Sequence, residues 1–350
     1  MDCLVIKSEI QLRIYYIITV FLRRNKVFLY FCVVILIEFD MKIVSVEPIG
    51  INKERAEIIK KEFLELGHEF ICYTDRKEDE DTLKERMRDA DIVIISNIKL
   101  SRNVLETCPK LKMLSVAFTG IDHIDLDYCI ERNIKVYNAS GYATVAVAEL
   151  TIGLIIDVYR HITILDSDTR KRGTRNNFLG RQLRGKTAGI IGTGAIGQET
   201  AYMLQAMGCE IIAWNRTEKE EVKKHKIKYV SLKELMKKSD IISLHVPLTK
   251  ETNKLINGEL LALCKQDAII INTARGNIID MEALAENLKQ GSIAGAGIDV
   301  FEMEPPLPIN HPLLNAPNCI IVPHVGYATR EAFDIRIDIV IDNIKSWLNS

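Results

Sequence analysis

The stretch that decides the fold reads TAGIIGTGAIG and spans residues 187–197. An apolar run typical of a buried strand leads into GTGAIG, and a helical pattern follows to about Met207. A GxGxxG pattern carries little weight alone, but a strand before it and a helix after it are the context of a dinucleotide-binding loop. Gly192 permits a tight turn, Gly194 lets the backbone approach a pyrophosphate, and Gly197 lets the helix pack on the strand. We therefore expect the phosphates of a dinucleotide to face the free N–H groups at this helix start.

Strand and helix patterns alternate on both sides of this stretch, which indicates two successive α/β units. The expected strands cover residues 43–46, 70–73, 92–96, 113–117 and 136–138 before it, and 187–192, 210–215, 240–246, 268–272, 295–300 and 319–323 from it onward. Helices are expected at 54–66, near 83–90, over 143–168 as a long link, and at 330–347. Strands separated by helices form parallel sheets covered on both faces. We predict an α/β fold of two Rossmann-like or flavodoxin-like lobes, with a ligand cleft between them.

The position of the glycine loop indicates which of the two units binds the dinucleotide. The first strand of the first unit is followed by PIGIN instead of a glycine-rich loop, so the dinucleotide belongs to the second unit. We expect a substrate lobe of residues 41–141 plus 327–350, and a dinucleotide lobe of residues 142–326.

Residues 1–40 do not match the rest of the chain. Their longest apolar run covers residues 27–37, which is shorter than the ~20 residues that a membrane span requires. No small-residue cleavage site follows it, so a signal peptide is a poor interpretation. We interpret the segment as an upstream extension of the reading frame with Met41 as the natural start; a peripheral membrane anchor is the alternative.

Composition excludes several classes of function. The 46 basic and 47 acidic residues leave a net charge of −1, so the chain has no overall positive charge that would attract nucleic acid or acidic lipid. The eight cysteines are scattered without a CxxC pair, which argues against a disulfide framework or a thiolate metal site. We expect no metal, no membrane span and a cytoplasmic location.

The strand after the glycine loop ends in residues that bear on the choice of dinucleotide. An Asp or Glu at this position usually binds the adenosine ribose, but this chain has Asn215, Arg216 and Thr217. Asn215 brings no negative charge to repel a 2′-phosphate, while Arg216 and Thr217 add a cation and a donor. We expect NADP(H) to be the preferred cofactor. NAD(H) remains possible, and in that case Arg216 would only stack on the adenine ring.

Three further polar segments follow expected strands of the second unit. They are NTARG at residues 272–276, DVFEMEP at 299–305 and VPHVG at 322–326. Because an open α/β sheet presents its ligand-binding groups at the carboxyl ends of its strands, Arg275, Glu304 and His324 are expected to converge in one cleft.

With these motifs the chain resembles the D-isomer-specific 2-hydroxyacid dehydrogenases, which include glyoxylate/hydroxypyruvate reductase, phosphoglycerate dehydrogenase and D-lactate dehydrogenase. The likeness covers residues 41–350 and also rests on HVPLT at 245–249 and TGIDHID at 119–125. It implies an NAD(P)-dependent oxidoreductase that interconverts a small 2-keto acid and a D-2-hydroxy acid. It further implies a homodimer formed around the long linking helix.

The resemblance implies a role for each matching residue. Arg275 would grip the substrate carboxylate, and His324, with a reference pKa of ~6.5, would exchange the proton with the keto oxygen. Glu304 would orient His324, and Asp299 would bind the nicotinamide carboxamide. Backbone amides near Thr119 and Gly120 would bind the substrate carboxylate across the cleft. The implied cofactor-binding set is Thr119, Gly192, Gly194, Ala195, Ile196, Gly197, Asn215, Arg216, Thr217, Val246, Pro247, Thr273, Ala274, Arg275, Asp299, His324 and Gly326.

Other interpretations stay open at this point. A D-3-phosphoglycerate dehydrogenase needs cations for the substrate phosphate, for which Lys99, Arg102 and Arg132 are candidates. A dinucleotide-sensing binding protein is a third possibility, although it would not require Arg275, Glu304 and His324 together. Formate dehydrogenases pair the histidine with Gln, whereas this chain has Glu304. His123 within TGIDHID is expected to be a structural or rim residue.

Overall fold

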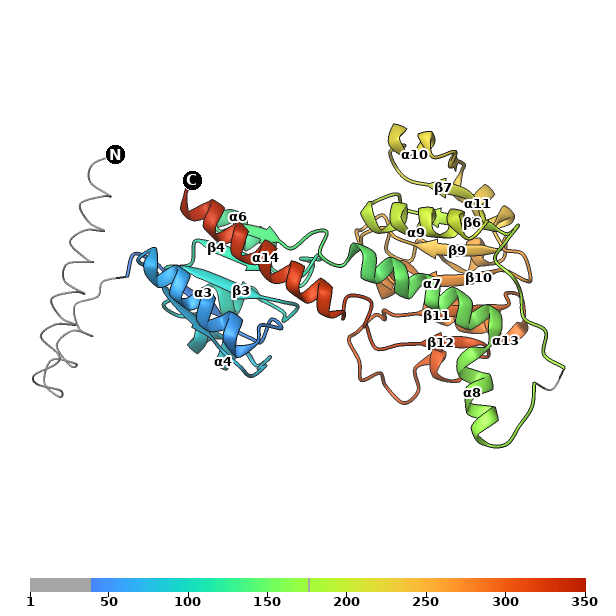
Figure 1. Ribbon diagram of the computed structural model, residues 1–350, viewed down its shortest axis with the longest axis horizontal. Helices are drawn as coiled ribbons and strands as arrows, with labels where there is room; N and C mark the ends of the chain where they lie inside the picture. Colours follow the sequence, from blue (N-terminus) through green and yellow to red (C-terminus); the bar gives the residue numbers. More distant parts are fainter. Residues whose placement is uncertain (1–38, 176) are drawn as a thin grey trace, which may run out of the picture.

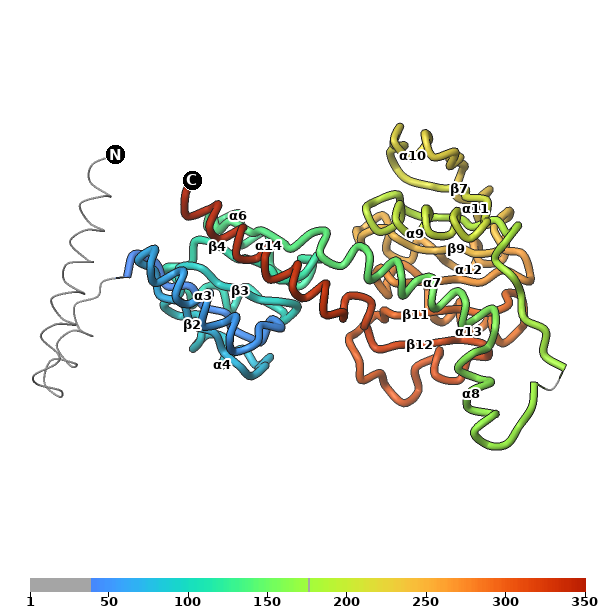
Figure 2. Tube along the Cα trace, in the orientation of Figure 1, coloured from blue at the N-terminus to red at the C-terminus, as the bar shows by residue number. Residues whose placement is uncertain are grey.

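The computed structural model describes residues 39–175 and 177–350. The prediction of an N-terminal extension falls almost wholly outside the described residues. Two parallel β-sheets lie in separate lobes, with residues 42–138 building one and residues 187–321 the other (Figures 1 and 2). The fold class predicted from the sequence is thereby confirmed.

The sheet of the first lobe has five strands in the order β2-β1-β3-β4-β5, the flavodoxin-like order. The strands are β1 Lys42–Ser45, β2 Glu69–Cys72, β3 Ile92–Ile95, β4 Met113–Val116 and β5 Lys135–Asn138; the helices between them are α3 Lys53–Glu65, α4 Glu80–Met87, α5 Arg102–Leu105 and α6 Leu126–Glu131. The central strands β3 and β4 are buried throughout, as expected for a parallel sheet covered on both faces.

The last helix of the chain, α14 Arg330–Leu348, returns to this first sheet (Figure 1). Thr329 caps its start by accepting a hydrogen bond from the Ala332 amide. The Ser115 hydroxyl in β4 donates to the Val340 carbonyl at 3.1 Å. Arg336 of the same helix is buried, and its guanidinium donates to the carbonyls of Ile49 and Ala117.

The second sheet has seven strands in the order β12-β11-β10-β9-β6-β7-β8. Its strands are β6 Thr187–Ile191, β7 Glu210–Trp214, β8 Lys228–Tyr229, β9 Ile241–Leu244, β10 Ile269–Asn272, β11 Gly295–Ile298 and β12 Cys319–Ile321; its helices are α9 Ala195–Ala206, α10 Glu220–Lys224, α11 Leu232–Lys238, α12 Gly258–Leu261 and α13 Met281–Gln290, with 3₁₀ turns at Gly276–Ile278 and Pro312–Asn315. The strand order reverses between β6 and β9, which is the dinucleotide-binding crevice of a doubly wound sheet. The short edge strand β8 was not predicted from the sequence.

The prediction of one long helix over residues 143–168 is wrong, because the structure has two helices in this region. α7 Thr144–Arg160 ends at His161, whose φ of 51° is left-handed, and α8 Ile162–Arg170 begins directly after it. The Asp157 carboxylate accepts the Thr163 amide at 2.9 Å, which satisfies a free N–H at the new helix start. The apolar pattern of α7 continues across this break and conceals it. Across residues 39–175 and 177–350, no helix combines the length and apolar character needed to cross a membrane.

Candidate functional site

The glycine loop lies between β6 and α9 and is shaped by two close backbone approaches. Gly192 has a φ of 101°, and a Cβ there would collide with the carbonyl of His245. A Cβ on Gly197 would overlap the carbonyl oxygen of Gly192. Gly194, in contrast, faces open space, with no atom within 4 Å of a Cβ built there. The loop thus fits a phosphate group that approaches the backbone at Gly194 and the exposed Ala195.

The wall beside this loop carries no extra charge. Val246 follows β9 and packs against Gly192. Burial lowers the pKa of His245 to about 3, and its Nε2 lies 2.9 Å from the Ser243 hydroxyl. His245 is therefore neutral at physiological pH and leaves the helix start as the local source of positive potential.

The adenosine end of the loop is organised by Asn215. Its side-chain oxygen faces the Thr193 amide at 3.4 Å, and its amide donates to the Thr217 carbonyl at 2.6 Å. Arg216 and Thr217 are exposed. The sequence did not single out Glu251, whose pKa is lowered mainly by its hydrogen bond with the Thr249 hydroxyl and to a smaller extent by the charge of Arg216.

The segment after β10 presents Arg275. Asn272 is buried, and its side chain accepts from the Ala274 amide at 3.0 Å and donates to the Arg275 carbonyl at 2.9 Å. These bonds fix the turn that projects Arg275 into the cleft. The Thr273 hydroxyl points instead into the lobe, 3.0 Å from the Thr151 hydroxyl of α7, so Thr273 offers mainly its backbone to a ligand.

The segment after β11 holds the histidine segment in place. Asp299 is buried, and its carboxylate accepts from the amides of Val325 at 2.7 Å and Gly326 at 2.9 Å. Burial raises the pKa of Asp299, while these two hydrogen bonds oppose the rise. The Asp299 carbonyl also accepts from the His324 amide at 2.9 Å, so one residue anchors three successive amides of the VPHVG segment.

His324 and Glu304 form a direct pair. Nδ1 of His324 lies 2.8 and 3.0 Å from the two oxygens of Glu304. The hydrogen bond with His324 lowers the pKa of Glu304 below its ordinary value, against a smaller opposing effect of burial. The imidazole is 13% exposed and lies edge-on to the rings of Phe118 and Tyr327. With Nδ1 held by a carboxylate, Nε2 is the nitrogen left to act on a substrate.

A cleft of about 650 Å³ brings these groups together. Arg275, Glu304 and His324 line it from the second lobe, and the loops after β3 and β4 line it from the first. Lys99 and Arg102, two of the predicted phosphate-binding candidates, reach this cleft, whereas Arg132 packs beside Tyr128. His123 also lines the cleft, and its Nε2 is buried without a hydrogen-bond partner among the described residues; burial lowers its pKa.

Several cleft residues were not predicted from the sequence. Phe118, Asp122 and Glu302 line the cleft. Asn272, Tyr327 and His311 lie behind it and contact the lining residues Arg275, His324 and Glu302; the side chains of Glu302 and His311 lie 3.2 Å apart. Asp122 and Asn272 lie in two motifs that the sequence analysis identified, TGIDHID and NTARG. Their position in these motifs could have marked them as candidate site residues. Phe118 and Tyr327 carry no pattern that distinguishes them from core aromatic residues.

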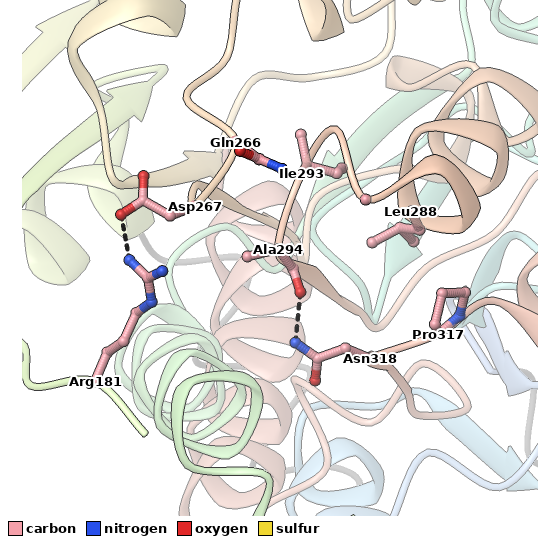
Figure 3. Close-up of a pocket in the computed structure, with 9 residues that line it drawn as sticks. Arg181, Gln266, Asp267, Leu288, Ile293, Ala294, Pro317 and Asn318 are labelled. Atoms are coloured by element: carbon pink, nitrogen blue, oxygen red, sulfur yellow. Dashed lines mark hydrogen bonds and ion pairs between the residues drawn. The ribbon is translucent and has the colours of Figure 1, made fainter. Parts of the chain in front are cut away.

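A second hollow of about 540 Å³ lies at the amino ends of β10, β11 and β12, away from the strand ends that carry the catalytic candidates (Figure 3). Its charged lining residues, Arg181 and Asp267, pair with each other, and the Asn318 amide donates to the Ala294 carbonyl at 2.7 Å. The Asn318 side-chain oxygen is buried there without a hydrogen-bond partner in the part of the chain that the structure describes. Among the described residues, no group of three or more His, Cys, Asp or Glu side chains is arranged to hold a metal ion.

Known proteins match both the fold and these segments. Residues 152–326 match the family model described as D-isomer specific 2-hydroxyacid dehydrogenase, NAD binding domain. A glyoxylate reductase of Thermococcus litoralis is 40% identical over 75% of this chain and 82% of its own length. A hydroxypyruvate reductase of Thermotoga maritima is 38% identical over 81% of this chain and 90% of its own. A D-3-phosphoglycerate dehydrogenase of Methanocaldococcus jannaschii is 42% identical over 76% of this chain, which spans about half (51%) of that relative.

Solved structures agree. An acyclic imino acid reductase in complex with NADPH and D-Arg superposes with a TM-score of 0.79 at 32% identity, covering 88% of this chain and 97% of its own. The chain belongs to the D-isomer specific 2-hydroxyacid dehydrogenase family. Its activity class is that of the family, namely an NAD(P)-dependent oxidoreductase acting on the CH–OH group of 2-hydroxy acids. The family and enzyme class predicted from the sequence are confirmed.

Proposed function

We propose that this enzyme reduces a small 2-keto acid of the glyoxylate or hydroxypyruvate type to the D-2-hydroxy acid, and catalyses the reverse reaction. The observation that carries the proposal is the convergence of Arg275 and the His324–Glu304 pair in one cleft. The names of the glyoxylate and hydroxypyruvate reductases among its relatives favour this substrate class.

Each of the three side chains has a distinct task in the proposed reaction. Arg275 binds the substrate carboxylate through its planar guanidinium. Glu304 accepts from Nδ1–H of His324 and so directs Nε2–H toward the keto oxygen. The bound dinucleotide supplies the hydride to the carbonyl carbon. As the carbonyl π bond breaks, its oxygen takes the Nε2 proton, and Glu304 stabilises the imidazolium before this transfer.

The remaining predicted contacts complete the proposed site. The exposed amides at Gly194 and Ala195 bind the pyrophosphate, with Ile196 and the tightly packed Gly192 and Gly197 forming the loop. The backbone of Thr273 and Ala274, together with Asp299 and Gly326, borders the nicotinamide. The amides at Thr119 and Gly120 face the substrate carboxylate from the first lobe. Val246 and Pro247 border the adenosine.

We further propose that the enzyme prefers NADP(H). Arg216 and Thr217 are exposed at the end of β7, and Asn215 places no carboxylate there. NADPH is bound in one structural relative. NAD(H), which lacks the 2′-phosphate, is a usable second cofactor in this proposal.

The proposed assembly is a homodimer in the cytoplasm. Ile162, Ile164 and Leu179 are exposed on α8 and the segment after it, with Leu179 82% exposed. Exposed apolar side chains in one region favour a protein interface. The six cysteines in the described part are free thiols, which suits a reducing compartment. The proposed substrate lobe comprises residues 41–141 plus 327–350, and the proposed dinucleotide lobe comprises residues 142–326.

A second candidate substrate is 3-phosphohydroxypyruvate. Lys99 and Arg102 line the cleft from the first lobe and could bind its phosphate. Arg102 already pairs with Glu106 and Glu131, which weakens this candidate.

The deciding experiment follows the loss of reduced-nicotinamide absorbance with NADPH or NADH. Glyoxylate, hydroxypyruvate, pyruvate, longer 2-keto acids and phosphohydroxypyruvate are offered in parallel to the chain from Met41. Rapid oxidation of NADPH with a small unphosphorylated keto acid is expected. Turnover confined to phosphohydroxypyruvate with NADH would select the second candidate. The variant His324→Ala is expected to lower kcat by orders of magnitude with little change in cofactor affinity.

A further inference from the structure

Arg275 reaches across the cleft into a loop of the first lobe. This loop follows β4 and presents Phe118, Gly120 and Asp122 to the guanidinium. The central carbon of the guanidinium lies 5.9 Å from the centre of the Phe118 ring. A Cβ on Gly120 would overlap Nη2 of Arg275, so a larger residue here would displace the guanidinium from this position. The loop after β4 in the first lobe therefore forms a binding pocket for the Arg275 guanidinium.

Each of the three nitrogens of the Arg275 guanidinium has an acceptor within hydrogen-bond distance. Nη1 donates to the carbonyl of Ala274 at 2.8 Å. Nε and Nη2 both face Oδ1 of Asp122, each at 3.4 Å. This pair of parallel donors is the edge of a guanidinium that a carboxylate binds with two hydrogen bonds. A carboxylate of the protein thus stands at the edge where the substrate carboxylate is expected.

We propose that Asp122 competes with the substrate for Arg275 and thereby sets the affinity of the enzyme for 2-keto monocarboxylates. The proposal rests on the function proposed above, in which Arg275 binds the substrate carboxylate. Substrate must break the Asp122 contact before it can take both donors of Arg275. Asp122 and Arg275 are 52% and 26% exposed, so the contact is hydrated and readily exchanged, as a competitor must be.

The opposite role for Asp122 predicts the opposite sign. If Asp122 oriented Arg275 for substrate, its removal would loosen the guanidinium and raise KM. If it competes, removal of its charge lowers KM, because Arg275 is then free and one negative charge that repels an anionic substrate is gone. General structural damage also raises KM, so a fall in KM separates competition from both.

The test compares Asp122→Asn with wild type, using glyoxylate as the substrate and oxalate as an unreactive carboxylate probe. Exposed ion pairs are weak, so we expect KM for glyoxylate and Ki for oxalate to fall about twofold to fivefold, with kcat/KM rising accordingly. Asp122→Ser, which removes the charge with a smaller side chain, should behave in the same way. Asp122→Glu restores a carboxylate and should not lower either constant.

The matched control is Asp127→Asn, which removes the same charge from an exposed position on α6. It is expected to leave KM and Ki near their wild-type values. A KM that rises or stays unchanged in both Asp122→Asn and Asp122→Ser overturns the proposal, as does an equal fall in Asp127→Asn. Failure of the proposed function is seen separately, because wild type would then reduce none of the 2-keto acids offered.

Discussion

The pair formed by Glu304 and His324 predicts how the rate depends on pH. We consider Glu304→Gln, which keeps the shape of the side chain but removes its charge. In the reductive direction His324 must carry a proton on Nε2 while Nδ1–H is held by Glu304. The hydrogen bond that lowers the pKa of Glu304 also stabilises the positive charge of its partner, and Glu304→Gln removes this stabilisation. The falling alkaline limb of kcat is therefore expected to move to lower pH, and kcat itself is expected to fall.

The size of the effect follows from the geometry of the pair. A hydrogen bond to a charged group contributes ~1.5–3 kcal/mol. The contact of 2.8 Å is short, but the Glu304 side chain is 61% exposed and screened by water, so we take the lower end. A free energy of ~1.4 kcal/mol equals one pH unit or a tenfold change in rate. We expect the limb to move by about one pH unit and kcat to fall about tenfold.

The assay measures kcat for reduction of the preferred keto acid across the pH range, at saturating cofactor. Glu302→Gln is the matched control, since it makes the same change two residues away on the same loop but faces His311. It should leave the limb where wild type has it, even if kcat falls. A limb that does not move in Glu304→Gln would refute the role of Glu304 in stabilising the protonated histidine.

Three further predictions concern the frame around these residues. Gly197→Ala places a Cβ against the carbonyl of Gly192 and should destabilise the fold by ~1–3 kcal/mol, measured as a lower urea midpoint, with weaker dinucleotide binding. Asn215→Asp adds a carboxylate that repels a 2′-phosphate and should lower the NADPH/NADH ratio of kcat/KM about tenfold or more, ~1.4 kcal/mol. Asp299→Asn leaves at least one loop amide without an acceptor and should lower thermal stability by ~1–3 kcal/mol together with kcat; an unchanged melting temperature would contradict the anchoring role.

The sequence predicted the parts of this fold that depend on local patterns. Buried strands such as Ile269–Asn272 are continuous apolar runs, and a glycine loop between a strand and a helix has few alternative structures. The expected convergence of Arg275, Glu304 and His324 followed from these strand ends, and the three residues line one cleft in the structure.

The parts that were missed depend on contacts distant in the sequence or on single backbone angles. Nothing in residues 143–168 marks His161 as left-handed, because the apolar spacing continues on both sides of it. The contact of Asp122 with Arg275 joins two lobes and spans 153 positions of sequence. Motif analysis identified both segments but could not show that the two side chains meet.

The backbone that carries Arg275 and His324 is fixed by two buried polar side chains. Asn272 fixes the turn of Arg275, and Asp299 fixes the amides around His324. Both of these supporting residues are buried at the carboxyl ends of adjacent strands, β10 and β11. The sheet register thus sets the spacing of the reacting groups, and substitutions at the two buried residues should alter catalysis without touching the substrate.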